Sequence, residues 1–203
     1  MSTERNPENT RLKILKAAFE EMHQHGFQGM RVDRVLEKTG LKKGAMYHHF
    51  PSKQALGYAV LEELIEKRIQ ELWIDPLENY DDPLDGLYQL FDSIGQIWPD
   101  AFFYLGCPLN KLAQEMSPID EGFRKRIEGF FQFWQNAAGE ALQKGQEKGI
   151  VDASVNVQDS ALFIIAVIEG ILGMTKIQRD KAVYERGKRE LKRYLESLRS
   201  TQA

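Results

Sequence analysis

The stretch LKKGAMYHHFPSKQAL, residues 41–56, decides how the N-terminal part of this chain folds. It concentrates lysine, tyrosine and histidine around one glycine, and it ends where Pro51 interrupts any helix. Ser52 directly after the proline is a good N-cap for a following helix. The stretch therefore predicts a short helix that is basic and aromatic, followed at once by another helix.

The short helix has two dissimilar sides. With Lys43 at zero and about 100 degrees per residue, Met46 and Phe50 fall together on one side, where they can pack against neighbouring helices. The opposite arc carries a cation, two polar rings and a residue without a side chain: Lys43, Gly44, Tyr47 and His48. Such an arc suits a groove lined by phosphates, because the cation attracts and the glycine allows close approach.

Two helices are expected before it. The spacing of Leu12, Leu15, Phe19 and Met22 predicts a first helix, with Thr10 as its N-cap and Gly26 as its end. A second helix follows from Val32 and ends at Thr39-Gly40. Three helices with a glycine turn between the last two match the helix-turn-helix plan, whose second member enters the major groove of DNA.

Lys53 lies in the first turn of the next helix. Unsatisfied backbone N–H groups and the helix dipole already favour an anion there. A phosphate contact by Lys53 would fix the reading helix in register without reading sequence.

Charge is unevenly distributed along the chain. The net charge of -3 divides into +4 over residues 1–53 and -7 over the remainder. This division suggests an anionic partner that meets only the N-terminal end, although chance unevenness on solvated faces also produces such differences.

The segment GFQGMRVDRVLEKTGLKKGAMYHHFPSKQAL resembles the DNA-binding region of the TetR family of bacterial repressors, in its Gly-Phe, Lys-Gly-x-x-Tyr-x-His-Phe and Ser-Lys-x-x-Leu motifs. The resemblance implies an all-helical homodimer, and it implies DNA contacts from these residues: Lys43, Gly44, Ala45, Tyr47, His48 and Lys53. Two positions depart from the family pattern. Lys42 stands where Ser or Thr usually caps the reading helix, which costs about 1 kcal/mol without another cap. Lys42 and Arg31 are therefore expected to add phosphate contacts instead.

The rest of the chain is also expected to be helical, since apolar residues recur at helical spacing and strict alternation is absent. The predicted fold is all-α, with a DNA-binding domain over residues 1–53 and an effector-binding and dimerisation domain over residues 54–203. A helix from about 53 to 73 links them. Further helix starts are indicated at Asp82-Pro83 and at Asn156, and a last helix covers roughly 180–198.

Aromatic residues are dense in the second domain. Packing within the core explains any single one, but together they can enclose an apolar cavity for a small hydrophobic or aromatic effector. The residues expected to line this pocket are Phe102, Phe103, Cys107, Phe123, Phe130, Trp134 and Phe163.

Cys107 is the only cysteine. A lone cysteine is usually an inert core residue. The alternative is a thiolate, favoured by a helix N-terminus and by Lys111 or Lys176, that reacts with oxidants or electrophiles. Some TetR-like regulators with a Gly-Cys at this place are thiol sensors, so Cys107 and Lys176 form a candidate sensor.

An enzyme is not indicated. The four histidines all lie in the N-terminal region, so Cys107 has no histidine base near it in sequence, and no P-loop or dinucleotide motif occurs. No metal and no cofactor is expected. The N-terminus lacks the apolar segment of a secretory signal, and the apolar run 161–168 is too short to span a bilayer, which favours the cytoplasm.

These features predict a dimeric repressor. It would bind a near-palindromic operator and be released by a small effector, with the helix around 158–175 and the last helix pairing with their copies. An activator, or a regulator triggered through Cys107, remains an alternative.

Overall fold

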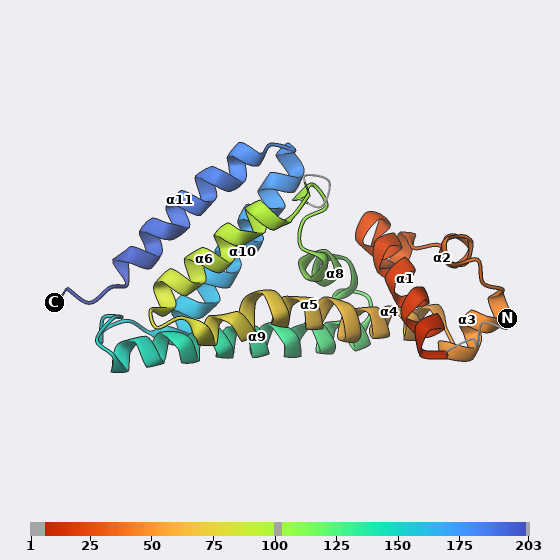
Figure 1. The fold of residues 1–203 in the computed structure, drawn as a ribbon, viewed down its shortest axis with the longest axis horizontal. Helices are drawn as coiled ribbons and strands as arrows, with labels where there is room; N and C mark the ends of the chain where they lie inside the picture. Colours follow the sequence, from red (N-terminus) through yellow and green to blue (C-terminus); the bar gives the residue numbers. More distant parts are fainter. Residues whose placement is uncertain (1–6, 100–102, 202–203) are drawn as a thin grey trace, which may run out of the picture. The chain divides into compact units, whose positions relative to one another are not determined.

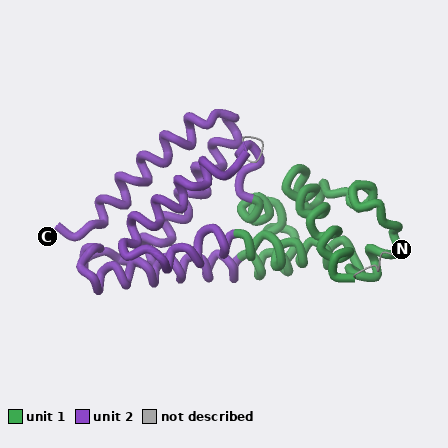
Figure 2. The backbone as a smooth tube through the Cα atoms, viewed as in Figure 1, with its two compact units in different colours: residues 1–68, 108–127 green, residues 69–107, 128–203 purple. Residues whose placement is uncertain are grey.

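A computed structural model of the chain describes residues 7–99 and 103–201. The chain divides into two compact units (Figure 2). Unit 1 comprises residues 1–68 and 108–127, and unit 2 comprises residues 69–107 and 128–203. Within the described ranges the fold is all-α; its extended pairing is one isolated bridge between Val151 and Arg199.

Unit 1 contains the helix-turn-helix region and a segment from later in the chain (Figure 1). Its elements are α1 (Pro7–Gly29), α2 (Val32–Thr39), α3 (Lys43–His49), α4 (Lys53–Val60), the π-helical η1 (Leu61–Glu66), the start of α5 (Lys67–Ile69), α8 (Pro108–Met116) and the first turns of α9 (Glu121–Glu147).

The first helix starts earlier than predicted, and it is interrupted at Gly26, where its end was predicted. It begins at Pro7, so Thr10 lies inside it and the predicted Thr10 cap is wrong, because a proline is well tolerated in a first turn. Gly26 has φ 79° and ψ 170°, which interrupts the helix where an end was expected. One more turn follows, up to Gly29.

The short helices are bounded as predicted. Gly40 adopts the left-handed conformation that ends α2, and its N–H donates to Leu36 O at 2.8 Å. Ser52 caps α4 by accepting from the N–H of Ala55. The helix-turn-helix is therefore determined by local capping on both sides of the reading helix.

The linking helix continues from α4 but changes its winding. π-helical turns occupy η1 and η2 (Gln70–Ile74), and a 3-10 turn, η3 (Asp75–Asn79), ends the run. The buried residues recur every four positions: Leu61, Ile65, Ile69, Trp73 and Leu77. In a regular α-helix this stripe would rotate by about 40 degrees at each step. The wider π turns keep it on one face.

Unit 2 consists of η2, η3, α6 (Pro83–Ile97), most of α9, α10 (Val157–Gln178) and α11 (Lys181–Ser197), where α11 packs along α10 and α6 (Figure 1). Asp82 caps α6 by accepting from Leu84 N and Asp85 N, with Pro83 at the first helical position. Asn156 caps α10 in the same manner. Both predicted helix starts are confirmed.

The division into units does not fall at residue 53. Residues 54–68 and 108–127 pack with the helix-turn-helix region. The packing units therefore do not coincide with the domains predicted from the sequence. The predicted functional boundary after residue 53 stays a prediction.

α10 is the one helix in the described ranges that is long and apolar enough to cross a membrane, judged by length and composition alone. Of its most apolar 18-residue window, 44% is buried inside the chain. The helix is longer than the apolar run 161–168 noted in the sequence, because it continues through the buried Glu169.

Candidate nucleic-acid interface

The reading helix α3 separates packing from exposure as its residue angles predict. Met46 and Phe50 are buried. The opposite side is exposed, and it consists of Lys43, Gly44, Tyr47 and His48, with Ala45 half-buried beside them. A helix of two turns therefore presents one basic and aromatic face to solvent.

Two details of this face favour a close partner. The ammonium of Lys43 lies 5.9 Å from the centroid of the Tyr47 ring, so the two side chains stand together one turn apart. A Cβ added at Gly44 would meet nothing of this chain within 4 Å. Packing within the chain therefore does not require a glycine at this position, and the surface beside it is open.

The flanking cations are exposed and do not cap. Arg31 and Lys42 occupy the N-cap positions of α2 and α3, and neither side chain makes a capping hydrogen bond. At the start of α3 the free backbone N–H of Ala45 is satisfied by the main chain, since it donates to the carbonyl oxygen of Lys42 at 2.9 Å. Both charged side chains are exposed and are not used as caps.

Lys53 begins α4, directly after the Ser52 cap. Its Nζ donates to the carbonyl oxygen of Gln28 at 3.0 Å and lies 5.1 Å from the centroid of the Phe27 ring. Burial lowers the pKa of Lys53, and the carboxylate of Glu115 acts in the opposite direction. Lys53 is thus half-buried and oriented rather than loose on the surface.

Arg11 supports the reading helix from behind. Its guanidinium lies 4.9 Å from the centroid of the Phe50 ring and forms an ion pair with Glu63. The hydrogen bond to Glu63 raises the pKa of Arg11 and lowers that of Glu63. No local pattern indicated this contact, since the partners are 52 residues apart.

Two further residues of unit 1 were missed for the same reason. Glu115 and Lys111, both on α8, bond to the backbone of α1 around its break at Gly26. No local pattern marks them, because their partners lie 87 or 88 residues earlier in the chain.

Family models match both parts of the chain. The model described as bacterial regulatory proteins, tetR family, matches residues 14–60, and the model of the tetracyclin repressor-like C-terminal domain matches residues 83–191. The chain belongs to the TetR family of transcriptional regulators. The family is a non-enzymatic, DNA-binding one, as the sequence predicted.

Relatives and solved structures agree with this assignment. An HTH-type transcriptional regulator encoded in the lacX 3' region of Lactococcus lactis is 31% identical, over 89% of this chain and 90% of its own. The repressor NemR of Escherichia coli is 27% identical over 84% and 86%. A TetR regulator from Chloroflexus aurantiacus superimposes with a TM-score of 0.85 at 23% identity, covering 96% and 98% of the two chains.

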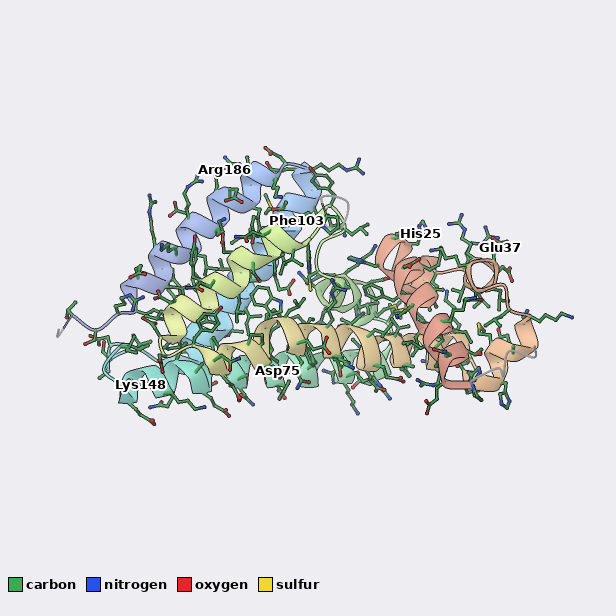
Figure 3. The ribbon with its side chains drawn as sticks, in the orientation of Figure 1. His25, Glu37, Asp75, Phe103, Lys148 and Arg186 are labelled. Carbon is green, nitrogen blue, oxygen red and sulfur yellow. The ribbon has the colours of Figure 1, made fainter. Side chains whose placement is uncertain are left out.

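In this TetR regulator the aromatic residues of unit 2 pack on one another. Successive ring centroids 4.7–6.3 Å apart connect Phe103, Tyr184, Phe91, Trp73, Trp134 and Phe131. Phe103, labelled in Figure 3, and Trp134 thus both belong to one continuous aromatic core. For these two residues the structure shows core packing.

The other residues expected in the pocket are dispersed. Phe130 is buried on α9, Phe163 is half exposed on α10, and Phe102 lies outside the described residues. Phe123 belongs to unit 1, where its ring packs 4.7 Å from Phe27 and 4.8 Å from Tyr58. Grouping Phe123 with the unit 2 aromatics by sequence density was wrong, since α9 runs through both units.

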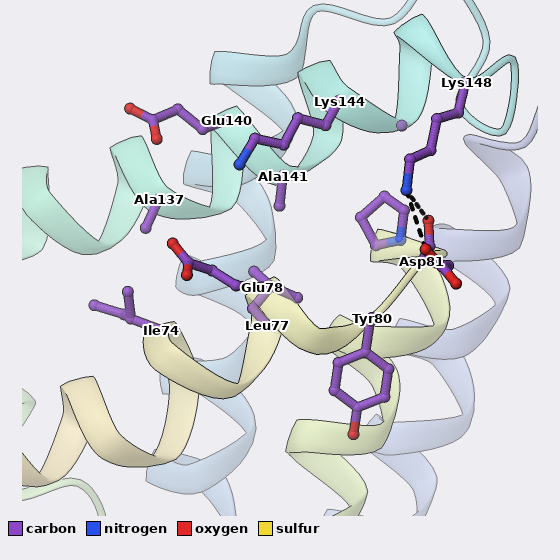
Figure 4. A pocket seen from close by; sticks show the side chains of 12 residues that line it. Ile74, Leu77, Glu78, Tyr80, Asp81, Ala137, Glu140, Ala141, Lys144 and Lys148 are labelled. Atoms are coloured by element: carbon purple, nitrogen blue, oxygen red, sulfur yellow. Dashed lines mark hydrogen bonds and ion pairs between the residues drawn. The ribbon is translucent and has the colours of Figure 1, made fainter.

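A cavity of about 140 Å³ opens elsewhere in unit 2, between η3 and the C-terminal half of α9 (Figure 4). Its apolar lining includes Ile74, Leu77 and Ala141, and Lys148 at its edge forms an ion pair with Asp81. None of the residues expected to bind an effector lines this cavity.

Cys107 is half-buried and is the last residue of the first segment of unit 2, directly before α8. Gly106 next to it has φ 73°, and a Cβ added there would lie 3.2 Å from Cδ of Lys176. The side chain of Lys176 therefore passes beside Gly106, the residue before Cys107. Lys111, the other lysine considered, donates to the carbonyls of His23 and Gln24.

Across residues 7–99 and 103–201, no group of three or more His, Cys, Asp or Glu side chains is placed to hold a metal ion. His23 is buried on α1 and His25 is exposed, while the rings of His48 and His49 meet edge to face at 5.5 Å.

Proposed function

We propose that this TetR regulator is a repressor that binds a near-palindromic operator as a dimer. The observation that carries the proposal is the exposed face of α3, with Lys43, Tyr47 and His48 outward and Met46 and Phe50 buried behind. Arg or Asn, the residues that specify bases most clearly, are absent from that face. DNA shape therefore supplies part of the selectivity.

Dimer formation is supported by the outer face of α10. Large apolar side chains are exposed there: Leu162, Phe163, Met174 and Ile177. Cβ atoms added at Gly170 and Gly173 would meet nothing of this chain within 4 Å, so these glycines are open to a second backbone. A groove of about 690 Å³ between α10 and α11 continues this surface and is lined by Ile171, Val183 and Gly187 among others.

Pairing of α10 and α11 with their copies gives a four-helix seam. It also accounts for an apolar helix whose most apolar 18-residue window is only 44% buried within one chain. Two reading helices held one helical turn of DNA apart are what a palindromic site requires.

A small hydrophobic or aromatic effector is proposed to release the DNA by binding in unit 2. The closed aromatic core between Phe103 and Trp134 would have to open for it, or the cavity beside Leu77 would take it. To lower operator affinity a hundredfold, the effector must prefer the non-binding state by about 2.7 kcal/mol.

The central experiment selects fragments of the source organism's DNA that the purified protein retains. We expect a short near-palindromic site, and deletion of the gene should raise the neighbouring transcript. A lowered transcript would show an activator, and retention of DNA without any shared site would reject sequence-specific regulation.

A thiol sensor acting through Cys107 is the second candidate. It is supported by Lys176, whose side chain passes beside Gly106, the residue before Cys107. NemR of E. coli, a repressor with the same fold, has been solved in a reduced form. A nearby cation favours the reactive thiolate. Loss of DNA binding on treatment with an oxidant, reversed by a thiol reductant and absent in Cys107→Ser, is the expected result. Release of Cys107→Ser by every oxidant and electrophile tried would exclude this candidate.

The regulator is proposed to act in the cytoplasm, where a bacterial chromosome is found. Membership of a DNA-binding family is consistent with that compartment.

A further inference from the structure

The break in α1 leaves backbone groups that need partners. Because Gly26 is not helical, the N–H groups of Phe27 and Gln28 begin a new turn and have no carbonyl one turn back. They donate instead to the two carboxylate oxygens of Glu115, at 2.9 and 2.8 Å. A Cβ at Gly26 would lie 2.5 Å from one of those oxygens, so the glycine makes room for the carboxylate.

The other side of the break is held by the same helix. Lys111, one turn before Glu115 on α8, donates to the carbonyl oxygens of His23 and Gln24 at 2.8 and 3.1 Å. The cation thus meets the carbonyl end of one helical segment and the anion meets the N–H end of the next. Both charges match the local helix dipoles. We call Lys111 and Glu115 the α8 clamp.

The hydrogen bonds of the α8 clamp extend through Gln28 to Lys53, the proposed phosphate contact. The N–H of Gln28 donates to Glu115, and the carbonyl oxygen of Gln28 accepts a hydrogen bond from Nζ of Lys53. An ammonium group has three N–H donors, and this bond uses one of them. With its ammonium 5.1 Å from the centroid of the Phe27 ring, the Lys53 side chain is held in one direction with donors left for a phosphate oxygen.

We propose that Glu115 is a positioning residue for DNA binding: it fixes the Phe27–Gln28 turn so that Lys53 points at a DNA phosphate. The inference rests on the proposed function, since it takes Lys53 as a phosphate contact. It also makes α8, which follows the first 60 residues by almost fifty positions, part of the DNA-binding unit.

The sign of the effect separates positioning from simple electrostatics. A carboxylate near DNA repels phosphates, so removing it should tighten binding if charge alone mattered. If Glu115 positions Lys53, Glu115→Gln weakens binding, because the NH2 group that replaces one carboxylate oxygen cannot accept from the N–H that this oxygen binds. Glu121→Gln is the matched control: it removes the same charge from α9 of unit 1, where Glu121 is exposed and pairs with Arg124 and Lys125.

The experiment measures affinity for a duplex that the unmodified full-length protein has selected from random DNA, as a function of salt. We expect Glu115→Gln to weaken binding by about tenfold and to flatten the salt slope by about one unit for each subunit, as Lys53→Ala does. In the Lys53→Ala background the same change should have almost no effect, because both act on one contact. Glu121→Gln should bind equally well or better.

Additive losses in the double variant, or an unchanged affinity and slope in Glu115→Gln, would overturn the inference. If Glu115→Gln fails to fold, Glu115→Asp serves instead, since it keeps the charge but is too short to hold both N–H groups; the same non-additivity is then required. If the unmodified protein selects no duplex, the proposed function itself fails. If the unmodified protein does select a duplex, and Lys53→Ala flattens the salt slope but Glu115→Gln does not, the proposed function stands and only the role of Glu115 is rejected.

Discussion

Tyr47 and Lys53 make different contributions to one surface. Tyr47 is exposed on α3 next to the Lys43 ammonium, whereas Lys53 is half-buried and bonded to the backbone of Gln28. The direction of the Lys53 side chain is determined by the protein, whereas the exposed Tyr47 ring contacts little of it. The proposed DNA contacts thus combine an exposed ring with an oriented cation.

The double variant Tyr47→Ala with Lys53→Ala tests both contacts. Losing two phosphate contacts in each subunit should flatten the plot of log affinity against log salt by about two units per subunit. The slope is measured by titrating a fluorescent operator duplex at several salt concentrations. An unchanged slope together with unchanged affinity would mean that this face does not meet DNA.

Glu66 gives unit 1 a pH dependence. Burial and the neighbouring Glu62 carboxylate raise its pKa to about 7, against the opposite effect of Arg126. The folded state thus holds a proton that the unfolded state has lost. The resulting stabilisation is complete below about pH 4.5 and is lost as the pH rises through about 7.

Glu66→Gln should therefore raise the melting temperature at pH 8 and change it little at pH 4.5. With solvent screening allowed for, the expected gain at pH 8 is about 1–2 kcal/mol in the free energy of unfolding. Thermal melts of the two proteins across this range provide the measurement. Parallel curves for the two proteins would contradict the assignment.

At the start of α6, one side chain acts both as a helix cap and as the partner of a distant cation. Asp82 caps α6 and also pairs with Arg199, just beyond α11, which in turn bonds to Asp85 at 2.7 Å. Burial alone would raise the pKa of Asp82, but the hydrogen bonds from Arg199, Asp85 and Leu84 outweigh it and the net pKa is lowered. One side chain thus stabilises a helix start and fastens the end of the chain to it.

Asp82→Ala is expected to lower the free energy of unfolding by about 1–2 kcal/mol, the usual cost of a lost N-cap with its partner. Asp81→Ala is the control: its side chain is exposed, and it pairs with Lys148 without capping the helix. Chemical denaturation of the two variants should separate them. Equal losses would show that the cap at Asp82 contributes nothing beyond a surface charge.

At the scale of the whole molecule, one chain leaves an apolar surface that a soluble monomer would not usually keep. The outer face of α10 carries Ile177, which is 75% exposed, and the open glycines 170 and 173 lie on the same helix. In the proposed dimer, a second copy covers this surface and determines the distance between the two reading helices. Affinity for a palindrome is then a property of the dimer.

Ile177→Asp should produce a monomer, because burying an unpaired carboxylate in the seam costs more than the contact gains. Affinity for the operator should fall with it. Ile97→Asp, at a residue that is 62% exposed on α6, should stay dimeric. Sedimentation or light scattering gives the mass; a dimeric Ile177→Asp protein would place the interface elsewhere.

Sequence patterns predicted most of the helices in the described ranges, the caps at Ser52, Asp82 and Asn156, the glycine turn of the helix-turn-helix and the outward face of α3. These features depend on residues within about one helical turn of each other, so periodicity and capping chemistry are enough to find them. Only the tertiary structure decided that Glu115 and Lys111 hold the break in α1, that Phe103 and Trp134 belong to one aromatic core, that Phe123 packs in unit 1, and that the linking helix winds into π turns. Those outcomes depend on packing between segments up to about ninety residues apart, and no local pattern records which of the many distant partners a side chain will meet.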